Sequence, residues 1–271
     1  MPDRPPASLT VEQASFAYAD TRIVDQLSLQ IEPGSFTVVI GPNACGKSTL
    51  LRGLARLLAP EEGQVVLDGR SIAGIPAKTL ARRMGLLPQT AVAPEGITVR
   101  DLVSRGRYPH RGMLRPWSPT DESAVVEALA ATGTTELADR PVDALSGGQR
   151  QRVWIAMVLA QQTEVLLLDE PTTYLDVAHQ VELLELLAAL HEQGRTIVAV
   201  LHDLNQAARY ATTVVAMRDG RVIAEGPPAE VVTSENVSAV FGLANTVIPD
   251  PVTGGPLVVP LRAPHVTEVR P

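Results

Sequence analysis

Glycine, lysine and serine are arranged in one segment of this chain at a spacing that suits a nucleotide phosphate. Gly41, Gly46, Lys47 and Ser48 fill the fixed positions of G-x-x-x-x-G-K-S. Glycines allow a tight turn in which successive N–H groups face an anion, and a lysine at this spacing can reach the β- and γ-phosphates. The serine hydroxyl is suited to bind Mg²⁺. We therefore predict a phosphate-binding loop with these members: Gly41, Pro42, Asn43, Ala44, Cys45, Gly46, Lys47 and Ser48, with Thr49 following.

Two carboxylates and a histidine follow apolar runs farther along the chain. Residues 165–168 are all apolar, which predicts a buried parallel strand that ends at Asp169 and is followed by Glu170. Asp169 can hold Mg²⁺ directly or through water, and Glu170 can polarise an attacking water. A similar run at 196–201 ends at His202. We predict a γ-phosphate contact for His202, although a structural role is the usual reading of a lone histidine.

Two further polar segments lie between these motifs. Ser146, Gly147, Gly148 and Gln149 precede an apolar, helix-like run at 153–160. The serine can simply cap that helix and the glycines can form an ordinary turn, but the same N–H groups can face a phosphate. Gln89 follows a proline between the phosphate loop and the later helices, where it is a candidate contact for Mg²⁺ or water.

Together these motifs resemble the ATPase subunits of ATP-binding cassette (ABC) transporters. The resemblance extends from about Leu9 to Gly226, and the LSGGQ sequence ending at Gln149 is its most specific element. It implies that residues 146–149 contact the γ-phosphate of ATP bound to an opposite subunit. It further implies a D-loop aspartate at Asp176 and an adenine-stacking aromatic at Tyr18, with Phe16 as the alternative.

In that family the remaining motif residues have defined roles. The resemblance implies that Lys47, Gln89, Glu170 and His202 serve catalysis, and that Ser48, Gln89 and Asp169 serve Mg²⁺. ATP and Mg²⁺ are therefore the expected cofactors.

The expected fold is an α/β phosphate-loop (RecA-like) core with an antiparallel β subdomain and an inserted helical subdomain. Short alternating segments before residue 68 predict the antiparallel strands. We treat residues 1–271 as a single domain. We assign 8–90 and 161–226 to the core with its β subdomain, 91–160 to the helical subdomain and 227–271 to a C-terminal tail that is proline-rich at its end.

Composition excludes several classes of protein. The formal charge is 23 − 30 = −7, which disfavours a nucleic-acid binder. The longest apolar run is far too short to span a bilayer, and the first ten residues carry no apolar signal-peptide core. The single cysteine excludes an intrachain disulfide and fits a reducing compartment. We expect a peripheral protein at the cytoplasmic face of the membrane.

Cys45 and a basic stretch raise separate questions. Cys45 lies near the positive end of the predicted helix, which is expected to lower its thiol pKa. Basic side chains cluster with aromatic ones between 100 and 117, and this stretch is either a solvated face or a surface near the permease. Its members are Arg100, Arg105, Arg107, Tyr108, His110, Arg111, Met113, Leu114, Arg115 and Trp117.

Residues 106–110, Trp117 and residues 171–180 also resemble the ATPases of ferric-siderophore, haem and cobalamin importers. Helix surface is the alternative reading for Tyr174 and His179 within that segment. The expected function is ATP hydrolysis that energises ferric-siderophore uptake, with haem or cobalamin import as the alternative. The expected partners are a second copy of the chain, integral-membrane permease subunits and, indirectly, a substrate-binding protein. A soluble ABC ATPase of DNA repair or translation is the alternative from another class.

Overall fold

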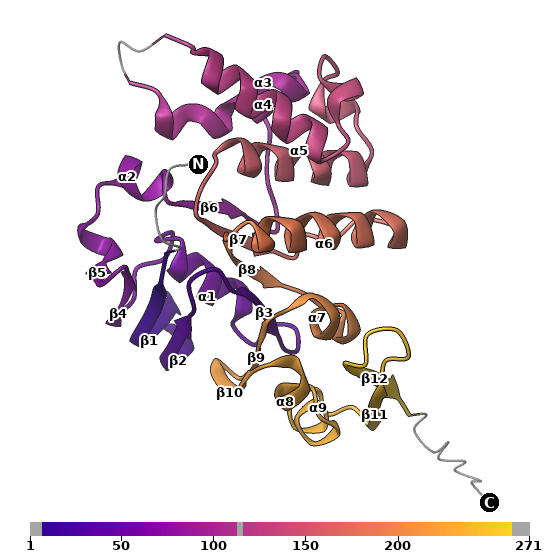
Figure 1. Cartoon of the computed structure of the whole chain (residues 1–271). Helices are drawn as coiled ribbons and strands as arrows, with labels where there is room; N and C mark the ends of the chain where they lie inside the picture. Colours follow the sequence, from indigo (N-terminus) through magenta and orange to yellow (C-terminus); the bar gives the residue numbers. More distant parts are fainter. Residues whose placement is uncertain (1–6, 113–115, 262–271) are drawn as a thin grey trace, which may run out of the picture.

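A six-stranded sheet forms the centre of the molecule (Figure 1). The computed structural model describes residues 7–112 and 116–261. The sheet has the order β10-β9-β3-β8-β7-β6, and all its neighbours are parallel except β9 and β10. Its strands are β3 (Phe36–Ile40), β6 (Met84–Leu87), β7 (Val165–Asp169), β8 (Thr196–Val200), β9 (Thr213–Arg218) and β10 (Arg221–Gly226). Every residue of β3, β7 and β8 is buried, as expected for parallel strands covered on both faces.

A second, antiparallel sheet lies beside the first and has the order β2-β1-β4-β5. Its strands are β1 (Leu9–Tyr18), β2 (Thr21–Ile31), β4 (Glu62–Leu67) and β5 (Arg70–Ser71). Helix α1 (Lys47–Leu54) packs between the two sheets, and its apolar side chains share one core with both. Phe16 is fully buried there against Gly53, where a Cβ would come within 2.3 Å of the phenyl ring.

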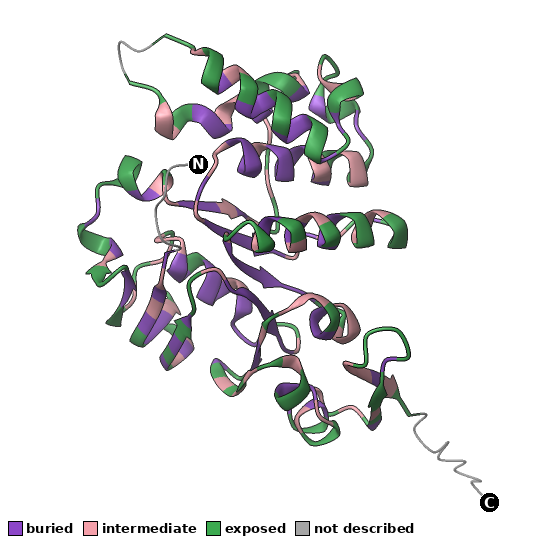
Figure 2. Ribbon diagram, viewed as in Figure 1, coloured by how far each residue is buried: buried purple, intermediate pink, exposed green. Residues whose placement is uncertain are grey.

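A helical layer covers the β6 end of the central sheet (Figure 1). Its α-helices are α3 (Val99–Ser104), α4 (Pro119–Ala131) and α5 (Gly147–Ala160), and its 3₁₀ helices are η2 (Arg105–His110), η3 (Thr135–Leu137) and η4 (Val142–Ala144). The connection from β5 to β6 holds η1 (Ile72–Gly74) and α2 (Ala77–Ala81). Helix α5 is mostly buried because α3, α4 and β6 all pack against it (Figure 2).

The remaining elements complete the core and fold the C-terminal segment. They are α6 (Val177–Glu192), α7 (Leu204–Tyr210), α8 (Pro228–Val231), α9 (Ser234–Phe241), β11 (Asn245–Pro249) and β12 (Pro256–Pro260). The β11–β12 hairpin is held on α7, because the Asn205 amide bonds both the N–H and the carbonyl of Val258. Arg209 also pairs with Asp250 at 2.6 Å. The segment from 227 to 261, interpreted above only as a tail, is therefore folded.

This architecture confirms the predicted fold class: a phosphate-loop α/β core, an antiparallel β subdomain and an inserted helical subdomain. Among residues 7–112 and 116–261, no helix has both the length and the apolar character needed to cross a bilayer.

Candidate nucleotide-binding site

A cavity of about 470 Å³ lies at the carboxyl ends of three neighbouring parallel strands. The phosphate loop follows β3, Glu170 follows β7, and His202 follows β8 after one residue. Ligands of open parallel sheets bind at this edge. The cavity is lined by Tyr18, Ile23, Asn43, Ala44, Gly46, Lys47, Ser48, Thr49, Gln89, Glu170 and His202.

The phosphate loop curls at Gly46, whose φ of 104° is strained for any residue with a side chain. This glycine is the N-cap of α1, so the first N–H groups of the helix face the cavity end of the loop. The Lys47 ammonium donates to the carbonyls of Gly41 at 2.8 Å and Pro42 at 2.7 Å. Lys47 is therefore held over the loop where phosphates would lie.

Ser48 and Asp169 provide two oxygen ligands that fit Mg²⁺. The Ser48 hydroxyl donates to Asp169 Oδ1 at 2.9 Å. Burial raises the pKa of Asp169, although the hydrogen bond from Ser48 opposes this effect. A buried carboxylate gains from a nearby cation, and hydroxyl and carboxylate oxygens are ligands that Mg²⁺ accepts. In the part of the chain that the structure describes, no three His, Cys, Asp or Glu side chains are grouped so that they could hold a metal ion by themselves.

Glu170 lies directly beyond this pair and is held from two sides. Its Oε1 is 2.7 Å from His202 Nε2, and its Oε2 accepts a hydrogen bond from Thr173 Oγ1 at 3.3 Å. The backbone of Glu170 has a φ of 52°, which is rare for a residue with a side chain. Such strain is common at functional sites, and here the turn after β7 aims the carboxylate into the cavity.

Tyr18 and Ile23 reach the cavity from the β1–β2 hairpin. The Tyr18 hydroxyl accepts a hydrogen bond from Arg52 Nη1 at 3.0 Å. Phe16, the alternative adenine contact, lies in the core and does not line the cavity. Ile23 is not among the site residues predicted from the sequence. The only indication of its role is its position in β2, the strand that pairs with the strand of Tyr18.

Residues 146–149 of the LSGGQ sequence, called the signature below, lie outside this cavity. Ser146 caps α5, because its Oγ accepts from the Gln149 N–H at 3.3 Å and its own N–H donates to Gln149 Oε1 at 3.1 Å. Gly147 instead lines a separate cavity of about 230 Å³, and Gln89 lines both cavities. Within the described chain, the signature therefore faces a different space from the phosphate loop.

Five other predicted site residues also do not line the nucleotide cavity. Three of them, Gly41, Pro42 and Cys45, belong to the phosphate loop. Asp169 is connected to the cavity only through its hydrogen bond with Ser48. Asp176 caps α6 by accepting the His179 N–H at 2.9 Å, and it also bonds His179 Nδ1 at 2.8 Å. Gly148 packs close to the carbonyl of Tyr174, which places the D-loop beside the signature.

The prediction of a lowered thiol pKa for Cys45 is wrong. Burial raises the pKa of this thiol and outweighs the favourable charge of Lys47. The sequence indicated the neighbouring helix end but not the depth at which the side chain lies. The residue is a buried, small apolar side chain behind the loop.

The basic stretch is neither a uniformly solvated face nor a uniform interface. The Arg107 side chain is buried and pairs with Asp121 at 3.0 Å, while its Nη1 donates to the Ala160 carbonyl at the end of α5. His110 bonds the carbonyl of Gln161. Tyr108 is exposed, and Arg111 lies over the Trp117 ring at 5.8 Å. Met113, Leu114 and Arg115 lie outside the described residues.

The fold and this site define a phosphate-loop nucleotide hydrolase. The chain belongs to the ABC transporter family, whose profile matches residues 24–173, and it is an ATPase of that family. It is 55% identical over 256 residues to the ferric enterobactin transport ATP-binding protein FepC of Escherichia coli K12, covering 94% of each chain. It is 53% identical to the petrobactin import ATP-binding protein FpuD of Bacillus anthracis, covering 93% of each.

Solved structures give the same assignment. An ABC transporter assigned to the metal-chelate type, in an inward-facing conformation, matches with a TM-score of 0.80 and 31% identity, covering 94% of this chain and 98% of that one. The dimeric ABC transporter cassette MJ0796 matches with a TM-score of 0.74 and 28% identity, covering 81% and 98%.

Proposed function

We propose that this chain is the ATP-hydrolysing subunit of a ferric-siderophore importer and acts at the cytoplasmic face of the membrane beside permease subunits. The observation that carries the catalytic part is that Lys47, Ser48 and the Glu170–His202 pair line one cavity, with Asp169 hydrogen-bonded to Ser48 beside it. The similarity to ATP-binding proteins of enterobactin and petrobactin import supports the choice of substrate.

Each residue of the site has a chemical task in this proposal. Tyr18 and Ile23 hold the adenine, and the N–H groups of the phosphate loop with Lys47 bind the phosphates. Ser48, Asp169 and Gln89 would hold Mg²⁺, which when bound offsets charge on the β- and γ-phosphates. Glu170 orients and deprotonates the attacking water, and His202 fixes the Glu170 carboxylate at 2.7 Å and reaches toward the γ-phosphate.

The site is completed in this proposal by a second copy of the chain. Residues 146–149 do not line the nucleotide cavity of their own chain. The Ser146 and Gln149 N–H groups are used in the helix cap, so the N–H groups of Gly147 and Gly148 at the start of α5 are the ones that would face a γ-phosphate bound by the partner. Closure of two such sites around ATP would shift the permease between two conformations, and hydrolysis would reopen the dimer.

Dimerisation gives the first test. Glu170→Gln with ATP is expected to dimerise more than with ADP, because only ATP offers a γ-phosphate to the signature. Adding Ser146→Arg is expected to prevent this by clash and misplaced charge. Light scattering during gel filtration measures the mass. Ser118→Arg is the matched control because Ser118 caps α4 with the same kind of capping box, away from the signature.

The dimer proposal fails if Glu170→Gln stays monomeric in saturating ATP across a range of protein concentrations. It fails equally if Ser146→Arg leaves the ATP-dependent dimer intact.

Substrate is tested in cells. A strain lacking this chain is expected to grow poorly on a ferric siderophore as sole iron source. Wild-type protein should restore growth, whereas Lys47→Ala should not, because its loop lacks the cation that binds the phosphates. Uptake of labelled ferric siderophore, haem and cobalamin provides the readout. Normal ferric-siderophore uptake with loss of haem or cobalamin uptake would overturn the siderophore assignment while leaving the importer assignment in place.

A further inference from the structure

The β1–β2 hairpin contributes two residues to the nucleotide cavity although it belongs to the antiparallel sheet. Tyr18 ends β1, and Ile23 lies near the start of β2. Neither residue belongs to the phosphate-loop core, so their position over that loop depends on how the outer half of the hairpin is held.

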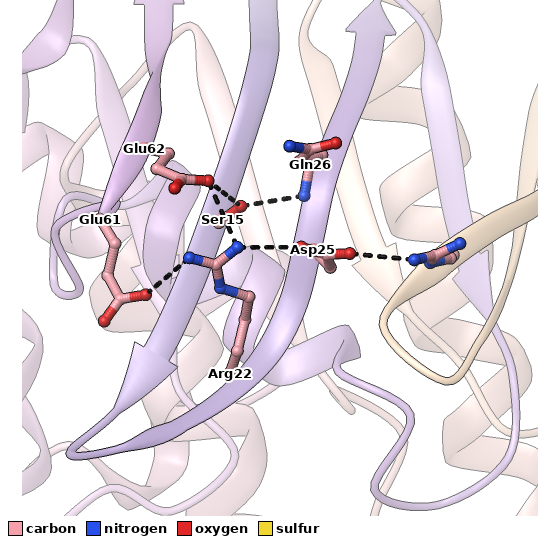
Figure 3. Close-up of polar contacts among 7 residues, drawn as sticks. Ser15, Arg22, Asp25, Gln26, Glu61 and Glu62 are labelled. Atoms are coloured by element: carbon pink, nitrogen blue, oxygen red, sulfur yellow. Dashed lines mark hydrogen bonds and ion pairs between the residues drawn. The ribbon is translucent and has the colours of Figure 1, made fainter.

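Arg22 lies between these two residues and joins three carboxylates (Figure 3). Its Nη1 is 3.1 Å from Asp25 Oδ1 and 3.3 Å from Glu62 Oε2, and its Nη2 is 3.4 Å from Glu61 Oε2. Asp25 belongs to the same strand, whereas Glu62 is the first residue of β4 and Glu61 directly precedes it. The guanidinium therefore links the outer part of β2, across β1, to the start of β4.

A bulge next to this cluster changes the direction of the hairpin. Pairing of β1 with β2 shifts register on both sides of Ser15, and Gln26 opposite has a φ of 45°. The fully buried Ser15 hydroxyl accepts the Gln26 N–H at 3.0 Å and donates to Glu62 Oε2 at 3.3 Å (Figure 3). Bulges bend and twist a strand, so this one sets the angle at which the outer half leaves the sheet. Glu62 holds both the bulge and Arg22.

The same cluster is linked to the back of the phosphate loop. The Asp25 carboxylate pairs with Arg221 at 3.0 Å. The backbone N–H of Asp25 donates to the Gly220 carbonyl at 3.4 Å. The Gly220 N–H in turn donates to the Cys45 carbonyl at 3.0 Å. Gly220 has a φ of 76°, and a Cβ there would come within 2.1 Å of the Ile23 carbonyl. The hairpin, the β9–β10 turn and the phosphate loop are thus in direct contact.

We propose that Arg22 is a positioning residue for the nucleobase: it holds Tyr18 and Ile23 over the phosphate loop through its contacts with Asp25, Glu61 and Glu62. Arg22 does not line the cavity and acts only through the hairpin. A hairpin already in place binds the base without losing the entropy of ordering it, whereas a released hairpin has to be ordered by the ligand. This inference rests on the proposed placement of adenine against Tyr18.

The test separates base binding from phosphate binding. Titration calorimetry with ADP, and competition by base-free tripolyphosphate, give two dissociation constants for each variant. Tyr18→Ala is expected to weaken ADP about tenfold, the order of one lost stacking contact. Arg22→Ala is expected to weaken ADP about fivefold, the upper range for exposed ion pairs, and to leave tripolyphosphate binding unchanged. Arg22→Lys should fall between, because an ammonium keeps the charge but not the fork geometry.

Non-additivity gives the sharper measurement. In the Tyr18→Ala background, Arg22→Ala is expected to have little further effect, because the base contact it supports is already lost. Arg209→Ala is the matched control, because it breaks the ion pair with Asp250 and Arg209 does not line the cavity. The Arg209 side chain is 44% exposed, compared with 39% for Arg22. ADP binding should then be unchanged. If Arg22→Ala does not fold, Asp25→Asn tests the same cluster by removing the charge of one carboxylate that pairs with Arg22.

Three results would overturn the inference. Arg22→Ala could leave ADP affinity unchanged while Tyr18→Ala weakens it, or it could weaken ADP and tripolyphosphate equally, or the two substitutions could be fully additive. An unchanged ADP affinity in Tyr18→Ala would instead overturn the adenine placement itself, and the two failures are therefore distinguishable.

Discussion

Glu170→Gln is expected to lower the maximal rate of ATP hydrolysis by about 10²-fold or more while ATP still binds. The amide keeps the size of the side chain and a hydrogen bond to His202, but it cannot take a proton from water. The Glu170 side chain is only 12% exposed and lines the same cavity as Lys47 and Ser48, so a base from bulk solvent cannot easily replace it.

Steady-state ATPase assays with a parallel nucleotide-binding assay measure both effects. Glu192→Gln, at the exposed end of α6, is the control for the same chemical change outside the site and should leave both values unchanged. Near-normal turnover in Glu170→Gln would remove that residue from its catalytic role.

Arg107→Met is expected to destabilise the helical layer by roughly 3 kcal/mol at pH 7, since it leaves the Asp121 carboxylate buried without its cation. Methionine keeps much of the aliphatic volume, so the effect reports mainly on the ion pair. Both tryptophans, Trp117 and Trp154, lie in or beside this layer. Their fluorescence during urea unfolding therefore measures the stability of the helical layer. Arg105→Met is the control, because Arg105 makes no ion pair among the described residues, and it should change the free energy of unfolding by less than about 0.5 kcal/mol.

The same pair predicts a pH dependence. Burial raises the pKa of Asp121, but hydrogen bonds from Ser118 and Arg107 outweigh it and bring the value from 3.8 down to about 2. A folded-state pKa below the unfolded one adds stability that is complete above pH 5 and is lost as the pH falls from about 4 to 2. About 1 kcal/mol of it should be gone at pH 3, so the difference between wild type and Arg107→Met should shrink there. A difference that stays constant from pH 7 to pH 3 would contradict the role of the pair.

Sequence patterns predicted the central sheet well because its signals are local. The apolar runs at 36–40 and 165–168 end at polar motifs, and parallel strands place such ends at one edge. From that reasoning we expect the phosphate loop, Glu170 and His202 to lie together, and they line one cavity in the structure. Asp169 lies beside them and accepts a hydrogen bond from Ser48. The fold class followed from the same motifs together with family resemblance.

Features that depend on distant contacts could not be predicted in this way. Arg107 looked like part of a basic surface, because nothing in its neighbourhood shows that Asp121 and the end of α5 enclose it. Ile23 has no polar chemistry to mark it. The fold of residues 227–261 depends on Asn205 and Arg209 of α7, so prolines in the segment itself suggested only a tail.

The strand order of the central sheet also fixes when the nucleotide site can form during synthesis. Strand β3, which leads into the phosphate loop, pairs with β8 on one side and β9 on the other. Its first residue donates its N–H to a side chain 176 positions later in the chain. As the protein leaves the ribosome, the phosphate loop emerges early, but β3 lacks β8 until residue 200 has followed and lacks β9 until residue 218 has followed. The nascent chain must therefore keep an apolar strand unpaired until β8 and β9 have been made, and the complete ATP site can form only after that point.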